Sequence, residues 1–180
     1  MKIFIIFFLA INLYSNVKQD ILNLYQNKKY EDACNLGFEK FSRHTKDEEY
    51  LSLYAFSCLK ADYIDRLALP IAMLKLSPEA RANSAYFSVI FMQKKLLYHA
   101  LLDDNDLSKF NLPTTDYVLS KVFEFYAKLG KHEKRTLYIF DDPSNNKVSY
   151  KLYLEKDYKI SKMVIEEYYD TMLIKRHIYW

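Results

Sequence analysis

The sequence contains very little glycine and proline, with 2 Gly and 4 Pro among 180 residues. Gly37 and Gly130 stand alone in the sequence, whereas phosphate-binding loops and dinucleotide fingerprints need several closely spaced glycines. A G-x-S-x-G nucleophile elbow is also absent. The composition therefore excludes these motifs and favours long regular elements with tight corners over a turn-rich β-sandwich.

A strong excess of one charge is also missing, because 26 Lys and Arg face 23 Asp and Glu, a formal net charge of +3. No basic or acidic tail is present, so we do not expect nucleic-acid binding. Hydrophobic residues make up 51% of the chain, which suffices for a sizeable core. The length fits one domain, or one domain with a small appendage.

Motifs for catalysis or metal binding are missing as well. The acidic run at 103–106 lacks the glycine and the terminal glutamate of a calcium-binding EF-hand loop. The adjacent pairs Glu48–Glu49 and Glu166–Glu167 would point apart on a helix and to opposite faces on a strand. The histidines are far apart in sequence: His44, His99, His132 and His177. We therefore assign no catalytic residue, no metal and no cofactor.

The N-terminus has the pattern of an export signal. Lys2 precedes an apolar run from Ile3 to Ile11, and a polar end with Ser15 follows. This pattern predicts a secretory signal peptide over residues 1–15, although a buried first helix or a short anchor is an alternative. The run is too short to span a bilayer comfortably. We expect an exported protein, in the bacterial periplasm, without a membrane span after signal removal.

Two cysteines, Cys34 and Cys58, form an even pair in what would be an oxidising compartment. Two interpretations are open: two small buried hydrophobic residues, which we favour, or a disulfide between adjacent helices. No histidine lies near enough in sequence to complete a zinc site.

Helical periodicity is clearest over residues 17–41. Apolar residues recur with offsets of 0, 4, 7 and 8 from Val17, and with offsets of 0, 3, 4, 7, 8 and 11 from Tyr30. Lys28 and Lys29 separate the two patterns, so the two helices must run antiparallel. The small residues Ala33 and Gly37 would let the helix backbones approach closely.

This corner resembles the tetratricopeptide (TPR) family, in which an aromatic ends the first helix and a Tyr followed by Ala begins the second. Tyr25, Tyr30 and Ala33 take these roles, while lysine replaces the corner glycine of the family. The resemblance spans residues 17–78 and is closest over 17–43. It implies an α-superhelix that presents a groove to partners.

Further helices are expected after this corner. One spans about Asp47 to Lys60, and the next carries Pro70, which should kink it or start a new helix. A third repeat unit is expected from Glu79, and another helix from an N-cap at Thr115 to a closing Gly130. Residues 16–133 are thus predicted to form a TPR-like helical-repeat domain.

After Thr136 the pattern changes to β-branched and aromatic segments separated by turn residues. Residues 134–180 predict a small antiparallel sheet of three or four strands, with one more helical pair as the alternative. The fold class is therefore mainly α: antiparallel helical hairpins in a TPR-like superhelix with a small C-terminal antiparallel β-sheet.

These features favour a non-catalytic, exported scaffold or adaptor that binds other envelope proteins. The TPR resemblance implies that first helices line the concave surface, which makes Tyr50, Tyr54 and Tyr86 candidate binding residues; core packing is their alternative role. An exposed Trp180 would anchor a partner. Two other functions are considered: an envelope hydrolase acting on cell-wall glycan or peptide with a lone Glu as general acid, and a subunit whose strand at 172–180 extends a partner's sheet. The sequence does not predict the oligomeric state.

Overall fold

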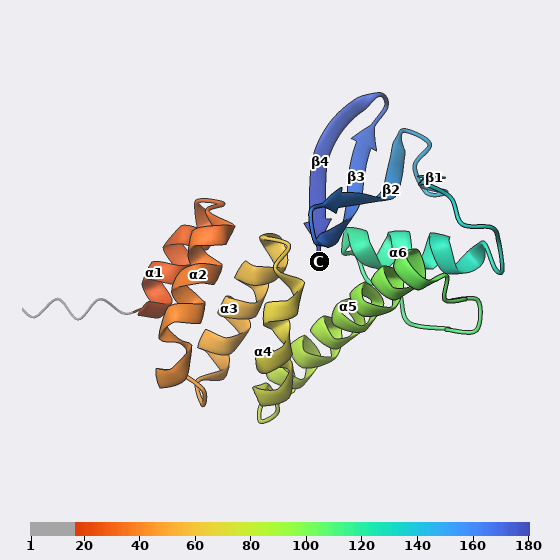
Figure 1. Ribbon diagram of the computed structural model, residues 1–180. Coiled ribbons are helices and arrows are strands. Elements are labelled where there is room, and N and C mark those ends of the chain that lie inside the picture. The colour runs from red at the N-terminus through yellow and green to blue at the C-terminus, as the bar shows by residue number, and fades with distance from the viewer. Residues whose placement is uncertain (1–16) are drawn as a thin grey trace, which may run out of the picture.

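The structure is a computed structural model that describes residues 17–180, so the predicted signal peptide lies outside the described residues. Helices and their connections occupy the described chain from Val17 to Lys128, and a four-stranded sheet follows (Figure 1). The helices are α1 (Val17–Gln26), α2 (Tyr30–Lys40), η1 (Phe41–Arg43), α3 (Glu48–Lys60), η2 (Ile64–Leu67), α4 (Ala68–Met73), α5 (Pro78–Asp103) and α6 (Val118–Lys128). The strands are β1 (Leu137–Asp141), β2 (Val148–Asp157), β3 (Ile160–Tyr169) and β4 (Met172–Tyr179). A mainly helical fold with a small C-terminal antiparallel sheet is therefore confirmed.

The corner at Lys28 reverses the chain between α1 and α2, as predicted (Figure 1). Lys28 adopts a left-handed conformation with φ of 59°. Its N–H donates to Tyr25 O, and the N–H of Lys29 donates to Leu24 O, both at 2.9 Å. This pair of bonds is the Schellman pattern, which satisfies carbonyls at a helix end.

Small residues let α2 pack closely against α3. A Cβ added to Gly37 would lie 2.5 Å from Cδ2 of Tyr54, so any larger residue would collide with that ring. One turn away, Cys34 and Cys58 form a disulfide that joins α2 to α3. Packing and a covalent bond thus hold the first hairpin against the next helix.

A second corner of the same kind follows α3. Asp62 has φ of 65°, its N–H donates to Leu59 O, and the N–H of Tyr63 donates to Cys58 O. The chain then forms η2 before α4 starts at Ala68, so Pro70 lies in the first turn of a new short helix. This position avoids the loss of an internal hydrogen bond.

Two predictions about the later helices were wrong. The expected third repeat unit is one continuous helix of 26 residues, α5, which begins at an N-cap where Ser77 Oγ accepts from Ala80 N at 3.1 Å. No glycine or proline interrupts it between Glu79 and Asp103. Thr115 does not cap α6, because Tyr117 is the N-cap residue.

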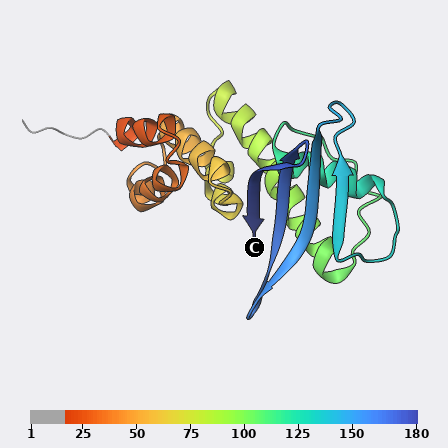
Figure 2. The same cartoon turned by 90° about the horizontal axis from the view of Figure 1, so that it is seen from above.

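The sheet has the antiparallel order β1-β2-β3-β4, which excludes the helical alternative for residues 134–180. Helices α5 and α6 lie against one face of it (Figure 2). Side chains on that inner face join the helices in one hydrophobic core, which runs from Ile21 to Tyr179. Among residues 17–180, no helix combines the length and apolarity needed to cross a bilayer.

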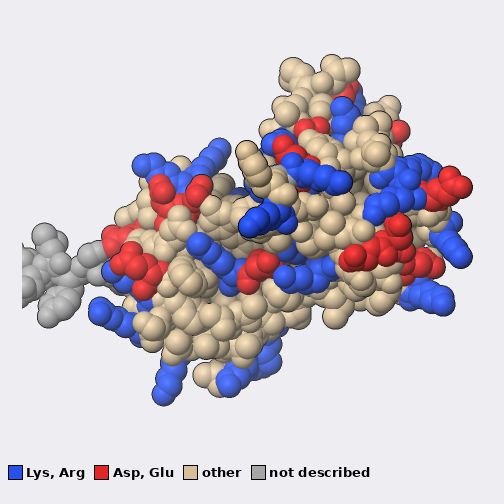
Figure 3. Space-filling view, in the orientation of Figure 1, with Lys and Arg blue, Asp and Glu red and all other residues tan. Residues whose placement is uncertain are grey.

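Positive and negative side chains are interspersed over the face seen in Figure 3, without a broad region of one sign. The end of the sheet that carries the β3–β4 turn is mostly uncharged in this view.

Candidate functional site

The inner face of the sheet is apolar except near one end of β3 and β4. Side chains alternate along a strand, and Met163 and Ile165 on β3 point toward the helices. Glu167 is therefore the next residue of β3 on the same face. On β4 the inward positions are taken by Tyr179, His177 and then Lys175. The strand register places His177 opposite Ile165 and Lys175 opposite Glu167. Strand pairing therefore gathers three ionisable groups on the side that faces the helices.

Asp62, at the corner after α3, contacts His177 and Lys175 from the helical side of the molecule. Its Oδ1 lies 2.8 Å from Nδ1 of His177 and accepts from the Tyr117 hydroxyl at 2.5 Å. The Tyr179 hydroxyl also donates to Oδ1 at 3.4 Å, and Nζ of Lys175 lies 3.5 Å from Oδ2. One carboxylate thus ties the corner after α3 to α6 and to β4.

Burial and charge shift the pKa values of these groups. Burial alone lowers the pKa of His177, but the hydrogen bond to Asp62 and the nearby Glu167 carboxylate more than reverse this, so its pKa is raised. The same His177 imidazole, more than any other group, lowers the pKa of Glu167. Burial raises the pKa of Tyr117 and Tyr179 well above 10.0. Glu167 is therefore ionised and both tyrosines are neutral near pH 7.

A cavity of about 360 Å³ opens between the helices and this end of the sheet, and we call it the cleft. The helices contribute three aromatic side chains, Tyr25 from α1, Phe56 from α3 and Tyr86 from α5. The sheet contributes Glu167 and His177. The rest of the lining consists of Leu59, Lys60, Asp116, Tyr117, Val118, Lys121, Tyr150 and Lys175.

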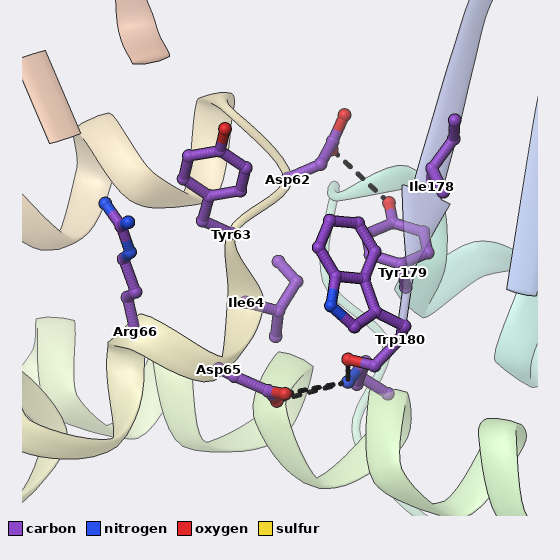
Figure 4. A pocket seen from close by; sticks show the side chains of 9 residues that line it. Asp62, Tyr63, Ile64, Asp65, Arg66, Ile178, Tyr179 and Trp180 are labelled. Carbon is purple, nitrogen blue, oxygen red and sulfur yellow. Dashed lines mark hydrogen bonds and ion pairs between the residues drawn. The ribbon is translucent and has the colours of Figure 1, made fainter. Parts of the chain in front are cut away.

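A second cavity of about 280 Å³, the Trp180 pocket, lies between η2 and the end of β4. Figure 4 shows the Trp180 indole on one side of it and Tyr63, Ile64 and Arg66 on the other. At its base the buried Lys94 ammonium donates to both carboxylate oxygens of Asp65, at 3.1 and 3.2 Å, and to the main-chain oxygen of Trp180. Burial lowers the pKa of Lys94 despite the Asp65 carboxylate.

Tyr50 and Tyr54 cannot bind a partner as predicted, because their exposed fractions are 0% and 1%. The Tyr50 hydroxyl donates to Gly37 O at 2.5 Å, and the Tyr50 ring stacks on His44. Tyr54 packs against Gly37 and Phe41. Small residues on α2 leave space that these two rings fill, so both are core residues.

The other predicted residues lie at the two cavities or in the core. Tyr86 lines the cleft, and Trp180, with 52% of its surface exposed, lines the second pocket. Cys34 and Cys58 are bonded to each other and fully buried.

The sequence reasoning missed Asp62, Glu167 and His177. A signal for two of them was available, since the alternation of β3 and β4 puts charged residues where apolar ones are expected. Asp62 gave no such signal, because a corner aspartate is usually only a turn residue.

Neither cavity is lined by Ser, Thr or Cys in the described part of the chain, so no conventional hydroxyl or thiol nucleophile faces the Asp62–His177 pair. Within residues 17–180, no group of three or more His, Cys, Asp or Glu is arranged to hold a metal ion. Comparison with known proteins gave no matching family model, no matching curated protein and no matching solved structure.

Proposed function

We propose that this protein is an exported, non-catalytic helical-repeat adaptor that binds another protein of the cell envelope through its Trp180 pocket. Two observations support export. The apolar N-terminal run has the pattern of a signal peptide. The Cys34–Cys58 disulfide is of a kind that persists mainly outside the reducing cytosol.

The repeat interpretation is supported by the two corners. Lys28 and Asp62 share the left-handed conformation and the same hydrogen-bond pattern, and they lie 34 residues apart. This spacing is the length of a TPR repeat, in which two helices form one unit. The chain from α1 to α4 thus has the connectivity of two such units.

The observation that carries the proposal is the arrangement around Trp180. Trp, Tyr and Arg are the residue types most enriched among those that dominate protein–protein binding energy. Half of the Trp180 surface is exposed beside an open pocket. Across this pocket, the Arg66 guanidinium lies between the rings of Phe38 and Tyr63, at 5.0 and 4.8 Å from their centroids.

Arg66 is also held in place before any partner arrives. Its Nη1 donates to Oδ1 of Asn35 at 2.8 Å. The Tyr63 hydroxyl donates to Glu31 at 2.5 Å. Binding of a partner to Arg66 and Tyr63 would therefore cost little side-chain conformational entropy, which favours tight binding.

The hydrolase alternative receives less support. A lone general acid must keep its proton near neutral pH, which requires a raised pKa. Among the described residues that line the cleft, the single Glu is Glu167, and its pKa is lowered by His177. Sheet extension through β4 is also disfavoured, because Lys175 and Arg176 place charges in the middle of this edge strand.

The test uses a photo-crosslinking amino acid at position 180 in cells that export the protein, followed by identification of the partner and binding with purified components. Trp180→Ala should weaken binding by about 30-fold, as expected for a central aromatic contact. Ile139→Ala removes an apolar side chain of comparable exposure from β1 and should leave the affinity unchanged. If no envelope protein crosslinks, or if both variants bind equally, the proposal is wrong.

A further inference from the structure

We infer that the cleft binds an uncharged saccharide unit, a site separate from the protein-binding pocket proposed above. The adaptor would then hold a glycan on one side of the Asp62 corner and a protein partner on the other. Three properties of the cleft carry this inference: an unpartnered buried nitrogen, a balanced charge, and a lining that combines aromatic and polar side chains.

The unpartnered nitrogen is Nε2 of His177. The side chain is 3% exposed, and Nε2 has no hydrogen-bond partner although the ring lines the cleft. Oε2 of Glu167 is 4.0 Å away, too far for a direct hydrogen bond. Since Asp62 fixes the other ring nitrogen at 2.8 Å, the imidazole cannot turn to find another partner. A buried polar atom without a partner is costly, so a polar ligand atom brought within hydrogen-bond distance would be favoured. The accessible surface of Nε2 is below 1 Å², so this contact requires a local movement of the side chains beside it.

A hydroxyl group fits this pair better than a charged group does. When His177 is protonated, both ring nitrogens carry a hydrogen, and a hydroxyl can then accept from Nε2–H and donate to the Glu167 carboxylate at the same time. A ligand carboxylate would bind His177 but lie beside the like charge of Glu167, and an ammonium would meet the reverse conflict. The geometry of His177 and Glu167 therefore selects for hydroxyl groups.

The charge around the cleft is balanced, which also disfavours a strongly charged ligand. Three lysines line it, but two of them already face carboxylates: Nζ of Lys121 lies 3.7 Å from Asp142, and Nζ of Lys175 lies 3.5 Å from Asp62. Asp116 and Glu167 add two negative charges to the lining. Such a mixture offers both donors and acceptors, which a polyhydroxylated ligand can use.

The aromatic side chains in the lining suit the apolar face of a sugar ring. Tyr25, Phe56 and Tyr86 are each half-buried and come from three different helices. The Tyr86 hydroxyl donates to Oδ1 of Asp116 at 2.8 Å, which fixes the orientation of the ring. The cavity volume lies at the lower end of the range for small-molecule sites, about 300–1,000 Å³. A cavity of this size suits a small ligand unit and not a folded protein segment.

The experiment titrates the purified mature protein with two uncharged oligosaccharides, chitotriose and maltotriose, and follows amide shifts by NMR. Acetate and lysine amide at the same concentrations are the charged probes. Binding of either oligosaccharide at α1, α5 and β3–β4 supports the inference. A preference for chitotriose indicates the N-acetylated sugars of wall glycan, and a preference for maltotriose indicates a plain hexose glycan.

Four variants test which residues bind the saccharide. Glu167→Gln should weaken saccharide binding about tenfold, as expected for one charge-assisted hydrogen bond. Tyr86→Ala should weaken it by a similar factor, whereas Tyr86→Phe keeps the ring and should retain most of the affinity. Trp180→Ala should leave saccharide binding unchanged, so a failure of the protein-partner proposal can be told apart from a failure of this one.

Three outcomes would overturn the inference. The first is the absence of shifts with either oligosaccharide at concentrations on the order of 10 mM, where even very weak ligands bind. The second is binding that Glu167→Gln and Tyr86→Ala both leave unaltered. The third is tighter binding of acetate or lysine amide than of the oligosaccharides.

Discussion

At the scale of single residues, a few side chains make structural contacts that could not be predicted from their positions in the sequence. Asp62 ends a helix in a left-handed conformation and also accepts hydrogen bonds from residues more than 50 positions away. Gly37 provides the space that Tyr54 occupies. Glu48 accepts from three consecutive main-chain N–H groups, those of Lys75, Leu76 and Ser77, at 2.6 to 2.9 Å.

Gly37→Ala should destabilise the protein, although alanine normally stabilises a helix interior by about 1 kcal/mol relative to glycine. The added Cβ would lie 2.5 Å from the Tyr54 ring, so we expect a loss of about 1–3 kcal/mol from overpacking. Urea unfolding followed by circular dichroism measures this. Gly130→Asn is the control, because asparagine tolerates the left-handed φ of 66° and no atom crowds that position. A stabilised Gly37→Ala variant would contradict the packing described here.

Glu48 should contribute to stability in acid. Main-chain N–H groups, that of Leu76 most strongly, lower its pKa from 4.5 to about 2. This contribution is present above pH 4.5 and is lost as the pH falls toward 2, because protonation removes the acceptor charge. Glu48→Gln should therefore flatten the decline of unfolding free energy over this range, while Glu133→Gln in an exposed loop should not. Equal slopes for both variants would count against the role of Glu48.

At the scale of elements, the two helical hairpins are joined covalently and the last strand is joined to them by hydrogen bonds. The disulfide connects α2 to α3 with a sequence separation of 24 residues. Asp62 and His177 connect the corner after α3 to β4. These two links fix how the hairpins sit relative to the sheet, and thereby shape both cavities.

Removing the disulfide by Cys34→Ala with Cys58→Ala should lower the free energy of unfolding by about 2–4 kcal/mol, mainly because the unfolded chain gains freedom. Reduction of the wild-type protein should lower it by a similar amount. Non-reducing gels of protein isolated from cells report whether the bond forms in vivo. A wild-type stability that is insensitive to reductant would show that the bond is not needed.

The link between Asp62 and His177 should make stability depend on pH. The pKa of His177 in the folded protein is above its ordinary value of 6.5. Its contribution is therefore fully present below pH 6.5 and is lost as the pH rises through the higher folded value. We expect the free energy of unfolding of the wild type to decrease over this interval, and that of Asp62→Asn to vary less. A steeper dependence in Asp62→Asn would contradict the assignment.

At the scale of the whole molecule, helices and sheet share one core. Buried residues form a single hydrophobic cluster from α1 to β4. The Tyr98 hydroxyl on α5 donates to Ser161 O on β3 at 2.5 Å, and Lys94 on α5 binds the main-chain oxygen of Trp180. The region 134–180, predicted as a small C-terminal antiparallel sheet, is packed into the same core as the helices.

This shared core predicts one cooperative unfolding transition. Thermal curves from far-UV circular dichroism, which reports helices, and from Trp180 fluorescence, which reports the end of the sheet, should coincide. A chain truncated after residue 133 should lose its sharp transition, because the inner faces of α5 and α6 would be exposed. Two separate transitions in the full chain would instead indicate two independent domains.

Much of the fold followed from local patterns. The helical periodicity located α1, α2 and α3, and the alternation after Thr136 predicted strands where four strands are found. The third repeat unit was wrong, because periodicity shows that a segment is helical without showing whether the chain turns back within it. The left-handed corner at Lys28 was located by the interruption of the pattern, although its lysine differs from the expected glycine.

The sequence by itself located most of the helices and favoured strands after Thr136, because hydrophobic periodicity is a local property of the chain. Only the tertiary structure decided that Tyr50 and Tyr54 are buried while Trp180 is exposed, and that Asp62, Glu167 and His177 meet. These outcomes depend on which faces pack together and on strand register, and both are set by contacts between residues far apart in sequence.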